Sequence, residues 1–215
     1  MSRSQRYQDS CDRTLTNLFR NLASDEAYVE ISRQNLALNT EFDAQKAFNL
    51  IDSRSVGKID AYDLVDFMRK NYISCDLSDA ADIIREYDAS NDANLQIAEF
   101  SQLVLPATNN GLRRAAEDRP RSLYYRANDP LPYSVVSLLV RLLEKELTLQ
   151  RHRNDSKRQL AMSPDFVKVR SFDDISRGRS QIGVSDLSYF LERNGFYPRR
   201  EDIEAILRRL DHNAD

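Results

Sequence analysis

The sequence has few of the residues that mark several large protein classes. Its 215 residues include no Trp, two Cys, five Gly and six Pro. The two cysteines, Cys11 and Cys75, lie far apart and support neither a disulfide framework nor a zinc site. So few turn-forming residues disfavour an all-β sandwich. With 41% hydrophobic and 30% charged residues, the composition is that of a globular rather than a disordered protein.

Long apolar runs are also missing. The most apolar stretch, Val135–Leu143, is interrupted by Ser137 and Arg141, and it is far shorter than the ~20 residues of a membrane span. The start of the chain carries neither a secretory signal nor a myristoylation signal. We therefore expect a soluble cytoplasmic protein without a membrane partner, and unpaired cysteines fit its reducing compartment.

Charge is unevenly divided along the chain. The net charge is -3, with an acidic excess in residues 1–108 and a basic excess in residues 109–215. The basic side chains form two stretches: Arg113, Arg114, Arg119, Arg121 and Arg126, then Arg151, Arg153, Lys157, Arg158, Lys168 and Arg170. They are consistent with a solvated linker and helix end, or with docking on an acidic protein surface. Nucleic acid is not expected as a partner, because no nucleic-acid-binding fold accompanies the charge and the pI is 5.6.

An internal repeat runs through the chain. Asp63–Asn71 returns as Asp186–Asn194, and Ser78–Asp88 returns as Glu201–Asp211. Both pairs of segments are 123 residues apart. A shared offset of this kind indicates two homologous halves, each of about 95 residues.

Within each half the apolar spacing predicts helices. A long leading helix is expected over residues 14–36 and again over residues 133–160, each followed by four shorter helices. The segment Pro106–Pro132 holds four of the six prolines, which predicts a linker rather than a packed element. The predicted fold is therefore all-α. Its expected divisions are residues 1–106, a linker at 107–132, and residues 133–215.

The loop that begins at Asp88 carries a regular pattern of oxygen-bearing side chains. They stand at loop positions 1, 3, 5, 9 and 12, with Leu95 at position 8. This spacing resembles the EF-hand of the calmodulin superfamily. The resemblance implies a calcium site formed by Asp88, Ser90, Asp92, Asn94, Gln96 and Glu99. Position 6 is Ala93, where the family has Gly for a turn with φ > 0, so its Cβ adds strain of roughly 1 kcal/mol. The residues themselves leave open whether this loop binds calcium or is a solvated acidic turn.

The partner loop, Asp52–Asp63, keeps the fold signal of the family but not its ligands. Gly57 and Ile59 retain the turn and the residue that forms a β-bridge to the neighbouring loop. Arg54 and Val56, however, replace two oxygen ligands, and Arg54 brings a positive charge to the position of the ion. This loop is not expected to hold calcium.

The two loops of the second half are also incomplete. The third is one residue shorter than the first, and its ligand positions fall on Ser176, Arg177, Gly178, Arg179 and Ser180. The fourth opens with the oxygen spacing of Asp211, Asn213 and Asp215, after which the sequence ends. We therefore expect two tandem EF-hand pairs, each preceded by a long helix, with the last EF-hand truncated and at most one calcium ion bound.

No sequence motif supports catalysis. His152 and His212 stand in polar surroundings, and no phosphate-binding Gly-rich loop with Lys and no H-E-x-x-H motif is present. Tandem EF-hand pairs with degenerate loops resemble the non-enzymatic EF-hand proteins of ciliary and other microtubule assemblies, whose partner, tubulin, is acidic. The resemblance implies a structural or adaptor protein of the cytoskeleton or cilium. The alternative is a cytosolic calcium-responsive regulator, although only 3 Met are available for the Met-rich groove of a sensor.

Overall fold

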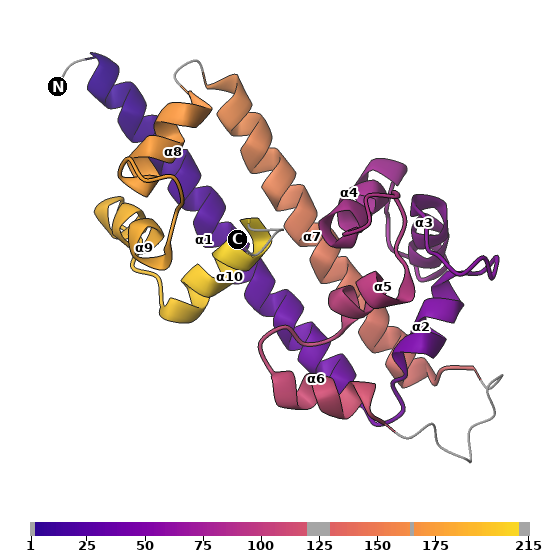
Figure 1. Cartoon of the computed structure of the whole chain (residues 1–215). Helices are drawn as coiled ribbons and strands as arrows, with labels where there is room; N and C mark the ends of the chain where they lie inside the picture. The colour runs from indigo at the N-terminus through magenta and orange to yellow at the C-terminus, as the bar shows by residue number, and fades with distance from the viewer. Residues whose placement is uncertain (1–2, 120–129, 164–165, 211–215) are drawn as a thin grey trace. The chain divides into compact units, whose positions relative to one another are not determined.

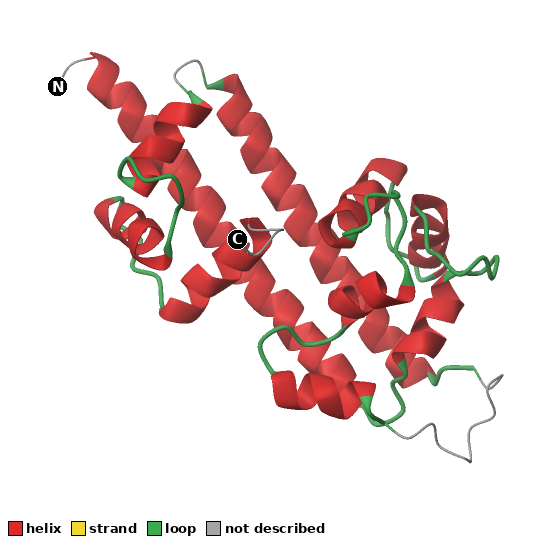
Figure 2. Cartoon of the chain, viewed as in Figure 1, coloured by secondary structure: helices red, strands yellow, loops and turns green. Residues whose placement is uncertain are grey.

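The computed structural model describes residues 3–119, 130–163 and 166–210. Helices dominate these residues and no strand is longer than a single bridge, so the predicted all-α class is confirmed (Figures 1 and 2). The helices are α1 (Arg3–Leu38), α2 (Ala44–Ile51), α3 (Ala61–Lys70), α4 (Leu77–Tyr87), α5 (Ile97–Val104), α6 (Asn110–Glu117), α7 (Tyr133–Met162), α8 (Lys168–Ser176), α9 (Val184–Arg193) and α10 (Arg200–Leu210).

The sequence repeat reappears in the bounds of the helices. Helices α3 and α9, and likewise α4 and α10, begin and end 123 residues apart. The ends of α3 and α9 are also closed in the same way. The side-chain amide of Asn71 donates to the carbonyl oxygen of Phe67 at 2.8 Å, and that of Asn194 donates to the carbonyl oxygen of Phe190 at 2.9 Å. A side chain that satisfies a terminal carbonyl stabilises a helix end, so the repeat also includes the residues that end these two helices.

Aspartates start helices α2, α3 and α4. The Asp43 side chain accepts from the backbone N–H of Lys46 at the start of α2. At the starts of α3 and α4, Asp60 and Asp76 each form a capping box with the aspartate three residues later. Each cap satisfies N–H groups that have no partner inside the helix, which fixes the boundaries locally.

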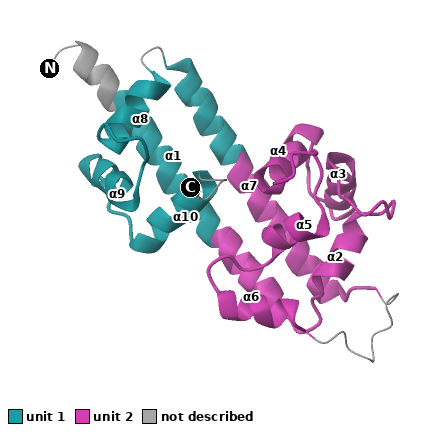
Figure 3. Ribbon diagram, viewed as in Figure 1, with its two compact units in different colours: residues 1–27, 151–215 teal, residues 28–150 magenta. Residues whose placement is uncertain are grey.

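The chain forms two compact units, and both long helices contribute to each (Figure 3). Unit 2 comprises residues 28–150, and unit 1 comprises residues 1–27 together with residues 151–215. This division differs from the predicted one, in which each long helix belonged to a single half. At 36 residues for α1 and 30 for α7, each helix is long enough to supply an apolar face to two cores.

Unit 2 has an apolar core crossed by a buried polar network. The rings of Phe48 and Phe100 meet edge to face at 5.6 Å. Arg33 on α1 donates to the hydroxyl of Tyr87 on α4, and that hydroxyl donates to Glu146 on α7 at 2.9 Å. Because buried polar groups need partners, this network specifies which helices pack together.

Within unit 2, α1 is also bonded to the segment that follows α5. The carboxylate of Glu30 accepts from the backbone N–H groups of Ala107 and Thr108, each at 3.0 Å, and from the Thr108 hydroxyl at 2.7 Å. Burial alone would raise the pKa of Glu30, but the bonds from Thr108, Ala107 and Gln34 outweigh it and lower that pKa. Glu30 is therefore held as a carboxylate.

Unit 1 is built on the same plan with a buried ion pair. The rings of Phe19 and Phe190 meet edge to face at 6.3 Å. The guanidinium of Arg209 on α10 donates to the carboxylate of Glu26 on α1 at 2.7 Å, and both side chains are almost completely buried. Helix α10 is thereby fixed to α1 by charge as well as by apolar packing.

The segment after Pro106 was predicted to be an unpacked linker, and this was wrong for its first part. Residues 110–117 form α6, and Arg113 pairs with Glu117 at 3.0 Å. Arg119 donates to the carbonyl oxygens of Ala37 and Asn39, which belong to the last turn of α1 and the residue after it. Local sequence did not reveal this, because the partners are about 80 residues away. Arg121 and Arg126 lie outside the described residues.

Within the part of the chain that the structure describes, no helix combines the length and apolar character needed to cross a bilayer.

Candidate functional site

The two loops of unit 2 are joined by a short antiparallel bridge. The backbone N–H of Ile59 donates to the carbonyl oxygen of Leu95 at 3.0 Å, and the N–H of Leu95 donates to that of Ile59 at 2.8 Å. Ile59 and Leu95 are both almost completely buried. The sequence predicted this bridge from the apolar residue at position 8 of each loop, and the prediction is confirmed. The bridge places loops 52–63 and 88–99 side by side.

In the loop from Asp88, the carboxylates accept hydrogen bonds from the loop's own backbone. Asp88 accepts from the N–H groups of Asp92 and Ala93 at 3.2 and 2.8 Å. Glu99 accepts from the N–H of Ser90 with one oxygen and from the N–H of Gln96 with the other, each at 2.9 Å. The first and last acidic residues of the loop thus hold its backbone in place through these hydrogen bonds.

The predicted strain in this loop is present. Ala93 has φ 61°, in the left-handed region, as does Asn91 with φ 57°. At the matching position of the other loop Gly57 has φ 80°, a conformation that costs glycine little. Ala93 therefore adopts the glycine conformation of the turn with a Cβ in place.

The donor chemistry of the loop suits a hard cation, because Asp88, Asp92 and Glu99 supply carboxylates and Ser90, Asn94 and Gln96 supply neutral oxygens. Among the described residues, however, no group of three or more His, Cys, Asp or Glu side chains is gathered as a metal centre. Asp92 uses one carboxylate oxygen to accept from the N–H of Asn94 at 3.0 Å. Calcium at this loop stays a prediction.

In the partner loop, an arginine lies where the resemblance places the ion. The guanidinium of Arg54 donates to both carboxylate oxygens of Asp63, at 3.1 and 2.8 Å, and to Asp60 at 2.5 Å. Asp63 is at position 12 and is almost completely buried, whereas Arg54 is half exposed. The hydrogen bonds from Arg54 to Asp63 and Asp60 raise the pKa of its guanidinium. Burial alone would raise the pKa of Asp60, but bonds from the Asp63 N–H and from Arg54 lower it.

The third loop contains the same kind of arginine–aspartate ion pair, formed by an arginine at a different loop position. Arg179 donates to both carboxylate oxygens of Asp186, at 2.9 and 3.1 Å. Asp186 is the repeat equivalent of Asp63 and is equally buried. Sequence reasoning expected this loop to be empty but missed the ion pair. The signal was available, because the 123-residue offset aligns Asp186 with Asp63 and both are preceded by an arginine within nine residues.

Two sequence predictions remain, of which the structure bears on one. The fourth loop, with Asp211, Asn213 and Asp215, lies outside the described residues. His152, which sequence reasoning placed on the surface, is half exposed and lies 2.8 Å from a carboxylate oxygen of Asp25.

Comparison of the chain with protein-family models, with curated proteins and with solved structures finds no match. The resemblance to EF-hand proteins therefore rests on the loop spacing, the repeat and the interloop bridge.

Proposed function

We propose that this chain is a non-catalytic protein of EF-hand type that acts as a structural or adaptor component of a protein assembly. The observation that carries the proposal is the arginine seated on the position-12 carboxylate in two loops, Arg54 on Asp63 and Arg179 on Asp186. Each guanidinium supplies the positive charge that a bound ion would otherwise supply. Loops closed by their own side chains hold the helices in one arrangement whether or not calcium is present.

We further propose a cytoplasmic, cytoskeletal setting with an acidic protein partner such as tubulin. The basic excess of residues 109–215 and the resemblance to ciliary EF-hand proteins support it. The internal contacts of α6 and of Arg119 limit which basic side chains are free to bind an acidic partner. Arg113 and Arg119 are held within unit 2, so Arg114, which is exposed, is the better candidate for docking.

The loop from Asp88 to Glu99 supports a second candidate function, a calcium-responsive regulator. The carboxylate of Glu99 is engaged by backbone N–H groups, whereas the equivalent carboxylates Asp63 and Asp186 are each held by an arginine. This loop is therefore the place where calcium would act.

The two functions are separated by measuring the response of the whole chain to calcium. For the structural function we expect the thermal midpoint to change little between excess calcium and chelator, and calorimetry to detect at most one ion. Two or more bound ions, or a large loss of helix on chelation, would favour the regulator. Co-sedimentation with microtubules, with and without chelator, tests the partner. An absence of binding in both conditions would refute tubulin.

The arginine itself is tested by Arg54→Ser, with Arg85→Ser as the matched control. Arg85 is exposed and pairs with Asp82 inside α4, outside the loop of residues 52–63. Removing Arg54 leaves Asp60 and Asp63 without their counter-cation, so the thermal midpoint of Arg54→Ser should become sensitive to added calcium. The midpoint of Arg85→Ser should not. Equal responses of the two variants would contradict the role assigned to Arg54.

A further inference from the structure

One face of α1 reverses the usual placement of charge on a helix. Between residues 27 and 38 the charged residues are Glu30 and Arg33, and their exposed fractions are only 7% and 2%. Over the same span the outward side chains include Tyr28, Ile31 and Leu38, which are 57%, 54% and 63% exposed. A helix whose outer face meets water normally shows the opposite pattern. The outward face of this part of α1 therefore has the composition of a contact surface.

The spacing of the outward residues is that of a helix-pairing seam. Tyr28, Ile31, Asn35 and Leu38 follow one another at intervals of three, four and three residues, which are the a and d positions of a heptad. The earlier part of α1 differs, because it exposes Arg13, Asn17 and Arg20. The seam is thus confined to the part of α1 in unit 2.

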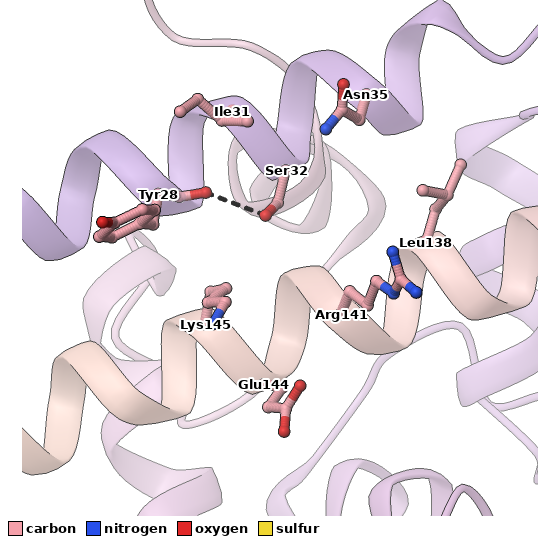
Figure 4. A pocket seen from close by; sticks show the side chains of 8 residues that line it. All are labelled: Tyr28, Ile31, Ser32, Asn35, Leu138, Arg141, Glu144 and Lys145. Atoms are coloured by element: carbon pink, nitrogen blue, oxygen red, sulfur yellow. Dashed lines mark hydrogen bonds between the residues drawn. The ribbon is translucent and has the colours of Figure 1, made fainter.

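A groove of about 400 Å³ runs along this seam, with α7 as its other wall (Figure 4). Tyr28 and Ile31 of α1 line one side, and Leu138, Arg141, Glu144 and Lys145 of α7 line the other. Arg141, Glu144 and Lys145 are exposed. Within the part of the chain that the structure describes, no ion pair involves any of these three residues. The α1 wall of the groove is thus uncharged, with Tyr28 and Ile31 beside Ser32 and Asn35, and the α7 wall carries charges of both signs.

Charges of both signs on one small patch fit a copy of the same patch. A uniformly acidic partner would meet Arg141 and Lys145 favourably but would oppose Glu144 with like charge, which is costly at an interface. In a two-fold contact the same patch occurs on both sides, so Arg141 and Glu144 of one copy can pair with Glu144 and Arg141 of the other. Arg141 and Glu144 are three residues apart on α7, so a two-fold axis crossing the groove sets Arg141 of each copy opposite Glu144 of the other. The same axis lays the α1 seams against each other, with Tyr28 near Leu38.

We propose that two copies of this chain associate through this face, defined as Tyr28, Ile31, Asn35 and Leu38 of α1 with Arg141, Glu144 and Lys145 of α7. The apolar seam supplies the buried centre of the contact. The exchanged Arg141–Glu144 pairs set the antiparallel orientation.

The first test is the oligomeric state of the whole chain, measured by sedimentation equilibrium over a concentration series. We expect a monomer–dimer equilibrium in the wild type, and a dissociation constant raised at least tenfold by Tyr28→Glu. The matched control is Tyr62→Glu, because Tyr62 on α3 is 66% exposed and lies outside the face. It should leave the constant unchanged. Circular dichroism checks that both variants keep the helical content of the wild type.

The second test is a charge exchange that only this pairing predicts. Arg141→Glu alone places two glutamates opposite each other, and Glu144→Arg alone places two arginines opposite each other, so each variant should be mainly monomeric. An equimolar mixture of the two variants should form a heterodimer, because each contact then joins opposite charges, one as the original Arg141–Glu144 pair and the other with the signs reversed.

Two results would overturn the proposal. A wild type that stays monomeric at the highest soluble concentration would show that a second copy does not occupy the face, which would leave it to a different protein. Dimers that persist in both single charge variants, or a mixture that fails to associate, would place the dimer contact elsewhere.

Discussion

The clearest quantitative prediction concerns Glu30, the buried carboxylate of α1. One of its oxygens accepts from Gln34 and from the N–H and hydroxyl of Thr108, and the other accepts from the Ala107 N–H at 3.0 Å and from Arg33 at 3.4 Å. In Glu30→Gln one oxygen keeps its bonds, but the new NH₂ group faces the donors of Ala107 and Arg33. One charge-assisted bond is lost and one buried N–H is left unpaired. At about 1–3 kcal/mol for each, the free energy of unfolding should fall by about 3 kcal/mol at pH 7.

This loss should depend on pH in a defined direction. The pKa of Glu30 in the folded protein is lowered from its ordinary value of 4.5, so the folded state binds this proton less readily than the unfolded state. The stabilisation is therefore fully present above about pH 4.5 and is lost as the pH falls through the folded-state pKa. Below that pH the wild type carries a protonated Glu30, which resembles the glutamine variant, so the difference in stability between the two proteins should become smaller.

The measurement is urea unfolding of the whole chain, followed by circular dichroism at pH 7 and at intervals down to pH 3. Glu201→Gln serves as the control, because Glu201 is exposed on α10 and its replacement should change stability by less than about 0.5 kcal/mol. A Glu30→Gln loss of the same size at pH 7 and pH 3 would refute the reasoning, since it would show that the side-chain shape and not the carboxylate charge stabilises the fold.

Three further predictions follow from other contacts. Arg209→Met should lower the free energy of unfolding by about 3–5 kcal/mol, because it leaves the carboxylate of Glu26 buried without the Arg209 guanidinium. Adding Glu26→Leu should restore much of the lost stability, and a double variant as unstable as the single one would contradict this. In calorimetric titrations, Glu99→Gln should abolish any calcium binding and Ala93→Gly should strengthen it; unchanged binding in Glu99→Gln would show that the loop was misread. Arg119→Ala should speed amide hydrogen exchange at the end of α1, measured by mass spectrometry, and unchanged exchange would mean that these carbonyls do not need the guanidinium.

The arginines in the loops form the same kind of ion pair in both halves of the repeat. Asp63 and its repeat equivalent Asp186 are each paired with an arginine side chain of their own loop. The two arginines come from different loop positions, Arg54 from position 3 and Arg179 from the repeat equivalent of position 5. The same carboxylate is thus paired by two different substitutions, which supports a requirement for positive charge at this point and not for one particular residue.

Much of the local structure was determined by the sequence itself. The 123-residue repeat predicted where the short helices would recur, and the apolar residues at position 8 predicted the bridge between Ile59 and Leu95. The left-handed backbone of Ala93 followed from its place in the loop. The helix ends and the turn at Ala93 depend on side chains within a few residues of the backbone that they organise. The bridge depends on two loops that carry the same pattern of residues, so its cause can also be recognised in the sequence.

Only the tertiary structure decided the features that join distant segments. Nothing in the local pattern showed that Glu30 and Arg33 lie inside while Tyr28 and Ile31 lie outside, since a charged residue can be buried only where partners from other segments meet it. Two of the partners of Glu30, Ala107 and Thr108, stand more than seventy residues along the chain, and those of Arg119 stand about eighty residues back. The division of α1 and α7 between two units was likewise beyond the sequence, because a long amphipathic helix shows which of its faces is apolar but not which helices cover each part of that face.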